Sequence, residues 1–157
     1  MPERVVDLRS DTVTLPTQEM QEAMNRAELG DDVYGEDPTV KRLEELAAAK
    51  VGMDRALFVP SGTMGNTAAL LAHTRPGEEV IFEDLAHLYN WEAGTYANIA
   101  GLTARPIHGD FGIFTGAQLA EAIRPDNVHF TRPTLVFLET PHNNAACPAW
   151  TPSEFDR

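Results

Sequence analysis

Residues 58–66 read FVPSGTMGN: a short apolar run, a proline, and then small and mostly polar residues. This order predicts the end of a strand, a turn and the start of a helix, which is the repeating step of a parallel α/β sheet. Ser61, Gly62 and Thr63 fall at the helix start, where free N–H groups and the helix dipole favour an anion. The residues leave two interpretations open, a phosphate cradle or a Ser/Thr N-cap that only begins a helix.

Helical and strand patterns alternate along the rest of the chain. We expect helices over 17–29, 38–51, 64–73, 85–97 and 115–124, and strands over 56–59, 78–82, 102–107 and 134–139. Thr17 and Asp37 are expected N-caps, and Pro38 suits a first helical turn. The alternation predicts a three-layer αβα fold with a mainly parallel sheet covered on both faces. The length of 157 residues favours one domain.

Composition restricts the possible partners. Asp and Glu number 24 against 12 Lys and Arg, which gives a net charge of -12 spread along the chain. This balance argues against nucleic acid and anionic membranes as partners, because both need a basic face. We find no apolar run long enough for a membrane span and no signal peptide, so we expect a cytoplasmic protein.

Cysteine and histidine spacings predict no metal site. The single cysteine, Cys147, has no intrachain partner, and no CxxC or clustered His/Cys pattern of a zinc site occurs. We expect Cys147 to be a small buried side chain rather than a nucleophile, because no base is evident near it.

Four further segments give the turn a context. DLRSDTVT (7–14) and GDDVYGEDP (30–38) precede it, and AHLYNWEAG (86–94) and IRPDNVHFTRP (123–133) follow it. In order and spacing they resemble the low-specificity branch of the aromatic amino acid β-eliminating lyase/threonine aldolase family. The resemblance runs from about Asp7 to about Asn143. It implies a fold-type I enzyme that uses pyridoxal 5′-phosphate (PLP), with a transferase-like large domain.

The resemblance implies a cofactor site at the opening turn. Ser61, Gly62 and Thr63 would hold the PLP phosphate, mainly through backbone N–H groups. His87 would stack on the pyridine ring and could also move protons, since an imidazole is planar and titrates near neutrality. By spacing alone, a surface or core histidine with a satisfied N–H is the favoured interpretation of His87.

The same resemblance implies substrate-site residues. His129 would lie near the substrate hydroxyl, Ser10 would contact the substrate carboxylate, and Tyr34 would border the site, reaching it from a neighbouring subunit. Without the family, the three read as a loop residue, a turn residue and a rim residue. Glu92 and Arg132 lie in matching segments, but for both we expect exposed salt bridges.

The implied reaction is retro-aldol cleavage of a β-hydroxy-α-amino acid, such as L-threonine or L-allo-threonine, to glycine and an aldehyde. A base would take the β-hydroxyl proton, with His129 or His87 as candidates. The implied partners are a small amino acid substrate and, in the full-length family, further copies in a dimer or tetramer.

This sequence departs from the family in its lysines. PLP chemistry needs a lysine for a Schiff base and an acid beside the pyridine nitrogen, and the only lysines are Lys41 and Lys50, in the predicted helix 38–51. Both family residues come later in the chain than position 157. Residues 1–157 are therefore expected to be the N-terminal part of an incomplete PLP-binding large domain without the small C-terminal domain, inactive alone.

Two alternatives remain open, a non-catalytic remnant that binds at most phosphate, PLP or a related subunit, and a different lyase of the same fold. We also expect aggregation or oligomerisation, because an incomplete sheet exposes its edges. A second departure is LETPHNNAACPAW (138–150), where the family has LENTHN and a glycine-rich turn. Glu139, His142 and Asn143 are retained, but the local backbone is expected to differ.

Overall fold

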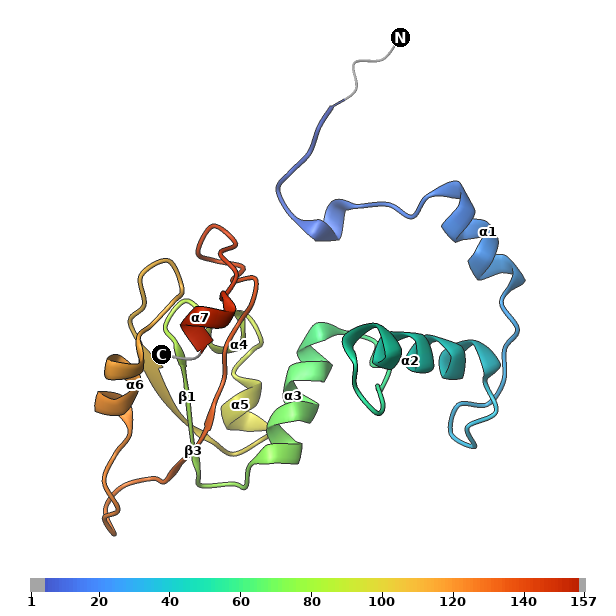
Figure 1. Cartoon of the computed structure of the whole chain (residues 1–157). Helices are drawn as coiled ribbons and strands as arrows, with labels where there is room; N and C mark the ends of the chain where they lie inside the picture. Colours follow the sequence, from blue (N-terminus) through green and yellow to red (C-terminus); the bar gives the residue numbers. More distant parts are fainter. Residues whose placement is uncertain (1–4, 156–157) are drawn as a thin grey trace. The chain divides into compact units, whose positions relative to one another are not determined.

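The computed structural model describes residues 5–155, and the chain divides into two compact units, Met1–Phe58 and Val59–Arg157 (Figure 1). Unit 1 carries a 3₁₀ turn, η1 (Asp11–Val13), and the helices α1 (Gln18–Arg26) and α2 (Pro38–Val51). Unit 2 carries a sheet with helices on both faces. The boundary between the units lies at the start of the FVPSGTMGN stretch: Phe58 is the last residue of unit 1, and Val59 is the first residue of unit 2.

The two helices of unit 1 begin where the sequence predicts. Thr17 caps α1 by accepting the N–H of Met20 at 3.3 Å. Asp37 caps α2, and Pro38 occupies its first turn. Gly52, with φ of 70°, ends α2 in the left-handed region that glycine tolerates best.

The loop between these helices is closed by Asp37. Its Oδ1 accepts the N–H groups of Thr39 and Val40, both at 2.9 Å, and its Oδ2 accepts the N–H of Gly30 at 3.1 Å. One buried carboxylate therefore holds the start of the loop and the start of α2 together. Gly30 is required there, because a Cβ would lie 2.3 Å from the carbonyl oxygen of Glu36.

The prediction of a strand over residues 56–59 is wrong. These residues are in no strand, and the expectation of burial fails too, since Leu57 is 75% and Phe58 52% exposed. The N–H of Phe58 donates to the Glu44 carboxylate at 2.7 Å, a bond to a helix side chain rather than to a neighbouring strand. A short apolar run is compatible with a strand only where another strand pairs with it.

The sheet of unit 2 is parallel, as predicted. It contains β1 (Glu79–Glu83), β2 (Thr103–Ile107) and β3 (Pro133–Val136) in the order β2-β1-β3. β1 is the central strand, and all five of its residues are buried. β3 is shorter than the predicted 134–139, although Phe137 continues the pairing by donating its N–H to the Ile81 carbonyl at 2.8 Å.

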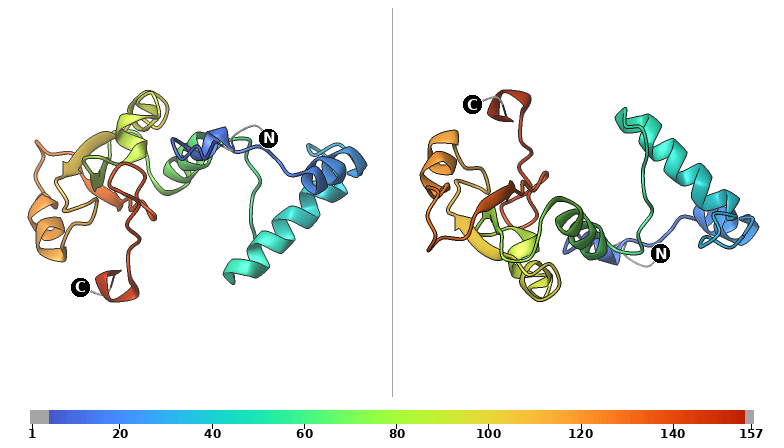
Figure 2. Two further views of the ribbon diagram at one scale, coloured as in Figure 1. Left: turned by 90° about the horizontal axis from the view of Figure 1, so that it is seen from above. Right: turned by 90° about the horizontal axis from the view of Figure 1, so that it is seen from below.

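Helices cover both faces of this sheet, so the three-layer prediction is confirmed within unit 2 (Figure 2). Val80 and Phe82 of β1 face one layer, and Ile81 faces the other. The first layer comprises α3 (Gly62–His73), α4 (His87–Asn90) and α5 (Thr95–Asn98), and the second contains α6 (Gly116–Ala122). The helix expected over 85–97 is two short helices, with Gly94 at a φ of 66° between them. A last short helix, α7 (Pro152–Phe155), follows the sheet.

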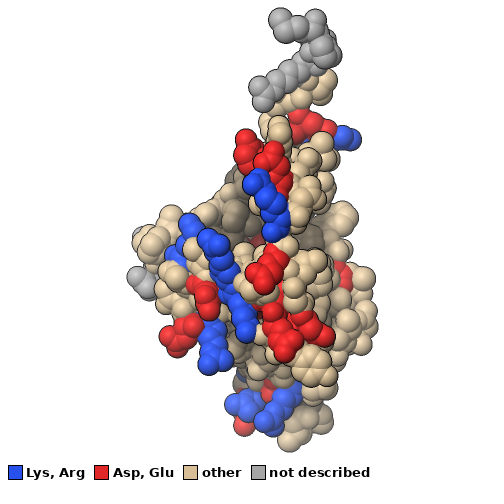
Figure 3. Space-filling view, turned by 90° about the vertical axis from the view of Figure 1, so that its right-hand side faces the viewer, with Lys and Arg blue, Asp and Glu red and all other residues tan. Residues whose placement is uncertain are grey.

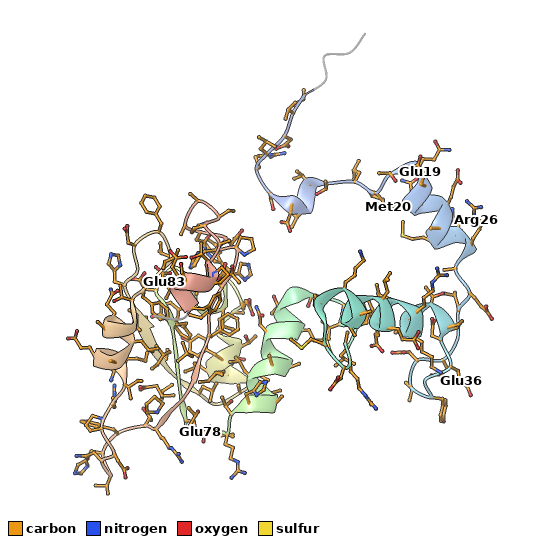
Figure 4. All side chains as sticks on the ribbon, in the orientation of Figure 1. Glu19, Met20, Arg26, Glu36, Glu78 and Glu83 are labelled. Atoms are coloured by element: carbon orange, nitrogen blue, oxygen red, sulfur yellow. The ribbon has the colours of Figure 1, made fainter. Side chains whose placement is uncertain are left out.

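Buried glutamates mark the two ends of β1. Glu79 accepts the Thr131 hydroxyl at 2.8 Å, and its carboxylate lies 3.3 Å from Arg105 Nε and 3.6 Å from Arg124 Nε. Glu83 lies 3.0 Å from the buried His142. Figure 4 labels Glu83 at one end of β1 and Glu78, which precedes β1, at the other. Residues after the strands therefore gather at the carboxyl edge near Glu83, and residues before them at the amino edge near Glu78.

Side chains of both charges lie on the face shown in Figure 3, with Asp and Glu interspersed among Lys and Arg. Two exposed pairs in unit 1 are local in sequence, Arg9 with Asp7 at 2.6 Å and Arg26 with Glu22 at 2.7 Å, and such pairs contribute little stability. Among residues 5–155, no helix has the length and apolar content that crossing a membrane requires.

Replacing Phe82 by alanine should destabilise unit 2 strongly. Phe82 is fully buried. The centroid of its ring lies 5.0 Å from the ring centroid of Tyr89 and 5.7 Å from that of Tyr96. Loss of such a ring costs about 3–5 kcal/mol, which urea unfolding monitored by tyrosine fluorescence would measure. Val128→Ala is the control, because Val128 is 96% exposed and should change stability by less than about 0.5 kcal/mol. Equal effects of the two substitutions would contradict the assigned core.

Acid should release the start of α2. The N–H groups of Val40, Gly30 and Thr39 hold the pKa of Asp37 below its ordinary value. Because the folded pKa is lowered, this carboxylate stabilises the fold above the unfolded pKa of about 3.9 and stops doing so as the pH falls through the lower, folded value. NMR titration of the Asp37 carboxyl carbon should give a midpoint below about 3.9, and the amide signals of Val40 and Gly30 should move with it. In Asp37→Asn these amides should show no such step, and an unshifted midpoint in the unsubstituted chain would refute the clamp.

Candidate functional site

The first turn of α3 has the properties of an anion site. Ser61 is the N-cap, and its hydroxyl oxygen accepts the N–H of Met64 at 3.1 Å, so the capping interpretation is confirmed. Within residues 5–155, the N–H groups of Gly62 and Thr63 donate to no protein acceptor. A Cβ on Gly62 would meet no atom within 4 Å, so the space beside this backbone is open. The Ser61 O–H is still able to donate, and cap and cradle are compatible.

His87 lies beside a buried glutamate at the carboxyl edge of the sheet. Its Nδ1 is 2.9 Å from Glu92 Oε1, and the same oxygen accepts the amide Nδ2 of Asn66 at 2.6 Å. Asn66 belongs to the second turn of α3, so this contact joins the candidate anion site to His87. The exposed salt bridge expected for Glu92 is wrong, because Glu92 is only 2% exposed.

The backbone of His87 is held by a second carboxylate, that of Glu139. Glu139 follows β3, and its Oε2 accepts the N–H of His87 at 2.6 Å while its Oε1 accepts the N–H of Asn143 at 2.8 Å. The N-cap residue of α4 is Ala86, whose methyl side chain cannot accept a hydrogen bond from the helix. Glu139 therefore caps α4 from the segment that follows β3, and it holds the backbone of His87 at the start of that helix.

Two further acid–histidine contacts lie at this edge. His142 Nε2 is 3.0 Å from Glu83 Oε2, and both side chains are buried. His108 is exposed, and its Nδ1 lies 2.9 Å from Asp84 Oδ2, which raises the pKa of His108 by hydrogen bonding and charge. Within the described residues, no group of three or more His, Cys, Asp or Glu side chains is arranged to hold a metal ion.

His129 is not brought together with His87. It lies in the exposed loop between α6 and β3, at the amino edge of the sheet, where its N–H donates to the Asn127 side chain at 2.9 Å. Arg132 lies in the same loop and is exposed, as expected. This loop surrounds a hollow of about 480 Å³ whose lining includes Arg124, Arg132 and Phe130.

Ser10 and Tyr34 belong to unit 1, whereas the residues above belong to unit 2. The Ser10 hydroxyl accepts the N–H of Thr12 at 3.2 Å and so caps η1. Tyr34 is 79% exposed in the loop between α1 and α2.

The two lysines also belong to unit 1, and both are exposed on α2. Lys41 lines a hollow of about 590 Å³ together with the acidic side chains Glu44, Glu45 and Asp54. These surroundings are those of a solvated lysine on a polar helix face, as the sequence predicts.

The turn after Glu139 has an unusual backbone. Ala146 and Cys147 have φ of 63° and 58°, values that favour glycine. Two non-glycine residues thus adopt a conformation that glycine adopts more easily, and the expected difference from the family's backbone stays a prediction. The expectation that Cys147 is buried is wrong, because its side chain is exposed.

Comparisons with known proteins agree with the fold. The low specificity L-threonine aldolase of Escherichia coli (strain K12) is 45% identical over 145 residues, which are 92% of this chain and 44% of that protein. Low-specificity L-threonine aldolase 1 of Arabidopsis thaliana is 42% identical over 146 residues, 90% of this chain and 41% of that protein. This chain thus spans less than half the length of these relatives.

A solved structure shares the fold. A threonine aldolase of Leishmania major superposes with a TM-score of 0.71 at 21% identity, covering 87% of this chain and 39% of that one. The family described as beta-eliminating lyase matches residues 7–157, which is nearly the whole sequence. Because that match covers nearly the whole sequence, this chain belongs to the beta-eliminating lyase family.

Proposed function

We propose that this chain forms the cofactor-binding part of a PLP-dependent threonine aldolase, which cleaves L-threonine or L-allo-threonine to glycine and acetaldehyde. The observation that carries the proposal is the open first turn of α3, joined through Asn66 and Glu92 to His87. The names of the relatives supply the reaction and the substrate class.

The residues of unit 2 fit the cofactor. The N–H groups of Gly62 and Thr63, with the Ser61 hydroxyl, offer donors to a phosphate at the positive end of a twelve-residue helix. When bound, PLP supplies an electron sink for the bond that breaks. His87 is the candidate for packing on the pyridine ring and for accepting a proton, and its side chain is 40% exposed and thus accessible.

The other site residues remain parts of the proposal. Ser10 would bind the substrate carboxylate, Tyr34 would border the site, and His129 would act near the substrate hydroxyl. Since His129 lies at the opposite edge of the sheet from His87, its role would require a site shared with another chain. The exposed apolar side chains of unit 1, among them Met20, Met24 and Leu46, support association with a further copy.

Unit 2 contains no lysine that could form the Schiff base of PLP chemistry. Lys41 and Lys50 are the only lysines, and both are exposed on α2 of unit 1. We propose that the Schiff-base lysine and the acid beside the pyridine nitrogen come from outside these 157 residues. The same observation favours the second candidate function, a chain that binds a phosphorylated ligand or a related subunit without catalysing the reaction alone. We also propose a cytoplasmic location, which suits an exposed free thiol at Cys147.

Gly62→Asp should weaken phosphate binding without unfolding the chain. A carboxylate in the first turn of α3 favours the helix itself but repels a phosphate, and Gly62 has open space for the side chain. Binding of pyridoxine 5′-phosphate, which has no aldehyde to react with lysines, would be followed by the amide signals of Gly62, Thr63 and Asn66. We expect the Kd to rise at least about tenfold in the variant, a loss of about 1.4 kcal/mol.

Ala117→Asp is the matched control, because it places the same charge in the first turn of α6. It should leave the Kd unchanged. Pyridoxine without phosphate should bind more weakly than its phosphate ester to the unsubstituted chain. Equal Kd values for the two ligands, or binding unaffected by Gly62→Asp, would refute the cradle.

A hybrid enzyme would test the reaction. Residues 1–145 would be joined to the remaining C-terminal part of the Escherichia coli relative, and release of acetaldehyde from L-threonine would be measured. We expect activity in the hybrid and a loss of at least about 100-fold with His87→Ala, the magnitude typical of a general base. His73→Ala is the control, because His73 is exposed in the last turn of α3. A folded hybrid that binds PLP and leaves threonine intact would favour the non-catalytic alternative.

A further inference from the structure

The contact between His87 and Glu92 has one exposed partner and one buried partner. The His87 side chain is 40% exposed, whereas that of Glu92 is fully buried. A buried carboxylate without hydrogen-bond partners raises the free energy of the folded state. Breaking the contacts of Glu92 with its partners is therefore unfavourable. Both recorded partners, His87 Nδ1 and Asn66 Nδ2, meet the same oxygen, Oε1.

Asn66 decides which atom carries the shared proton. Its Nδ2 can only donate, so Glu92 Oε1 is an acceptor at 2.6 Å. The opposite amide orientation would place the Asn66 carbonyl oxygen against the carboxylate oxygen and would be repulsive. With Oε1 already accepting, the proton in the 2.9 Å contact to His87 belongs on Nδ1.

Glu139 holds the backbone of His87, so a backbone shift cannot move the imidazole ring away from Glu92. The His87 N–H is held at 2.6 Å by Glu139 Oε2, and the Trp91 N–H closes α4 by donating to the His87 carbonyl at 2.8 Å. His87 is thus fixed through its backbone and through Nδ1, and Nε2 is the ring nitrogen left for a ligand.

We propose that Glu92, oriented by Asn66, is a positioning residue that holds neutral His87 in the Nδ1–H tautomer. Nε2 then carries a lone pair and is the proton acceptor of the site. A neutral imidazole in water prefers the opposite tautomer, with the proton on Nε2, so the carboxylate reverses the ordinary preference. The tautomer follows from the contacts alone, while the identification of the accepted proton as that of the substrate hydroxyl rests on the proposed function.

Nitrogen-15 NMR of the histidine rings tests this directly on the 157-residue chain, without cofactor. At a pH about two units above the ordinary histidine pKa of about 6.5, Nδ1 of His87 should have the chemical shift of a protonated nitrogen and Nε2 that of an unprotonated one. Glu92→Leu removes the acceptor and should move the proton to Nε2. Glu92→Gln retains an acceptor oxygen and should keep the proton on Nδ1, which a merely space-filling role would not explain.

His108 is the internal reference, because its own partner is Asp84 and neither substitution touches it. Its signals should be unchanged in both variants. A proton on Nε2 of His87 in the unsubstituted chain, or equal populations of the two tautomers, would overturn the proposal even if Glu92→Leu failed to fold. An unchanged tautomer in a folded Glu92→Leu variant would overturn it as well. Failure of pyridoxine 5′-phosphate to bind would instead count against the proposed function and leave the tautomer result standing.

Discussion

The structure of unit 2 depends on burying a charged strand. All five residues of β1 are buried, and the first and the last are glutamates. Their carboxylates cannot stay in an apolar interior without partners, so each end of the strand requires its own polar cluster. Arg105 and Arg124 approach Glu79 at the amino edge, and His142 approaches Glu83 at the carboxyl edge. The apolar residues between the two ends then fix the helical layers.

The polar side chains at the carboxyl edge follow the same logic. Glu139 and Glu92 are acidic groups at least partly removed from water, and each is bonded to a part of His87. One bond holds its backbone and the other its ring. The site therefore orients a histidine by means of carboxylates that hold three elements together, α3, α4 and the segment after β3. Precise orientation of a side chain on short helices requires such support, because a four-residue helix has little rigidity of its own.

Features formed by residues close together in the sequence could be predicted, whereas contacts between distant segments could not. Caps such as Thr17, Asp37 and Ser61 could be predicted because a cap and its partner lie within three residues of each other. The burial of Glu92 could not, since its partner Asn66 is 26 residues away and only the fold brings them together. The sequence does place Glu92 only five residues after His87, which is compatible with a contact between them. That spacing alone does not distinguish a buried contact from an exposed one. The strand expected at 56–59 failed for a related reason, because an apolar run does not reveal whether a partner strand is available.

The proposed function separates two tasks that a PLP enzyme must combine. Donors for a phosphate and a fixed histidine both lie on unit 2, and their contacts with each other involve no residue of unit 1. The reactive amine is not among them. In the proposed function, the donors for the phosphate and the bonds that orient His87 all belong to unit 2, so both can be in place before a lysine is. A lysine supplied from elsewhere would then meet a site whose electrostatics are already set, which is the preorganisation that catalysis by positioned dipoles requires.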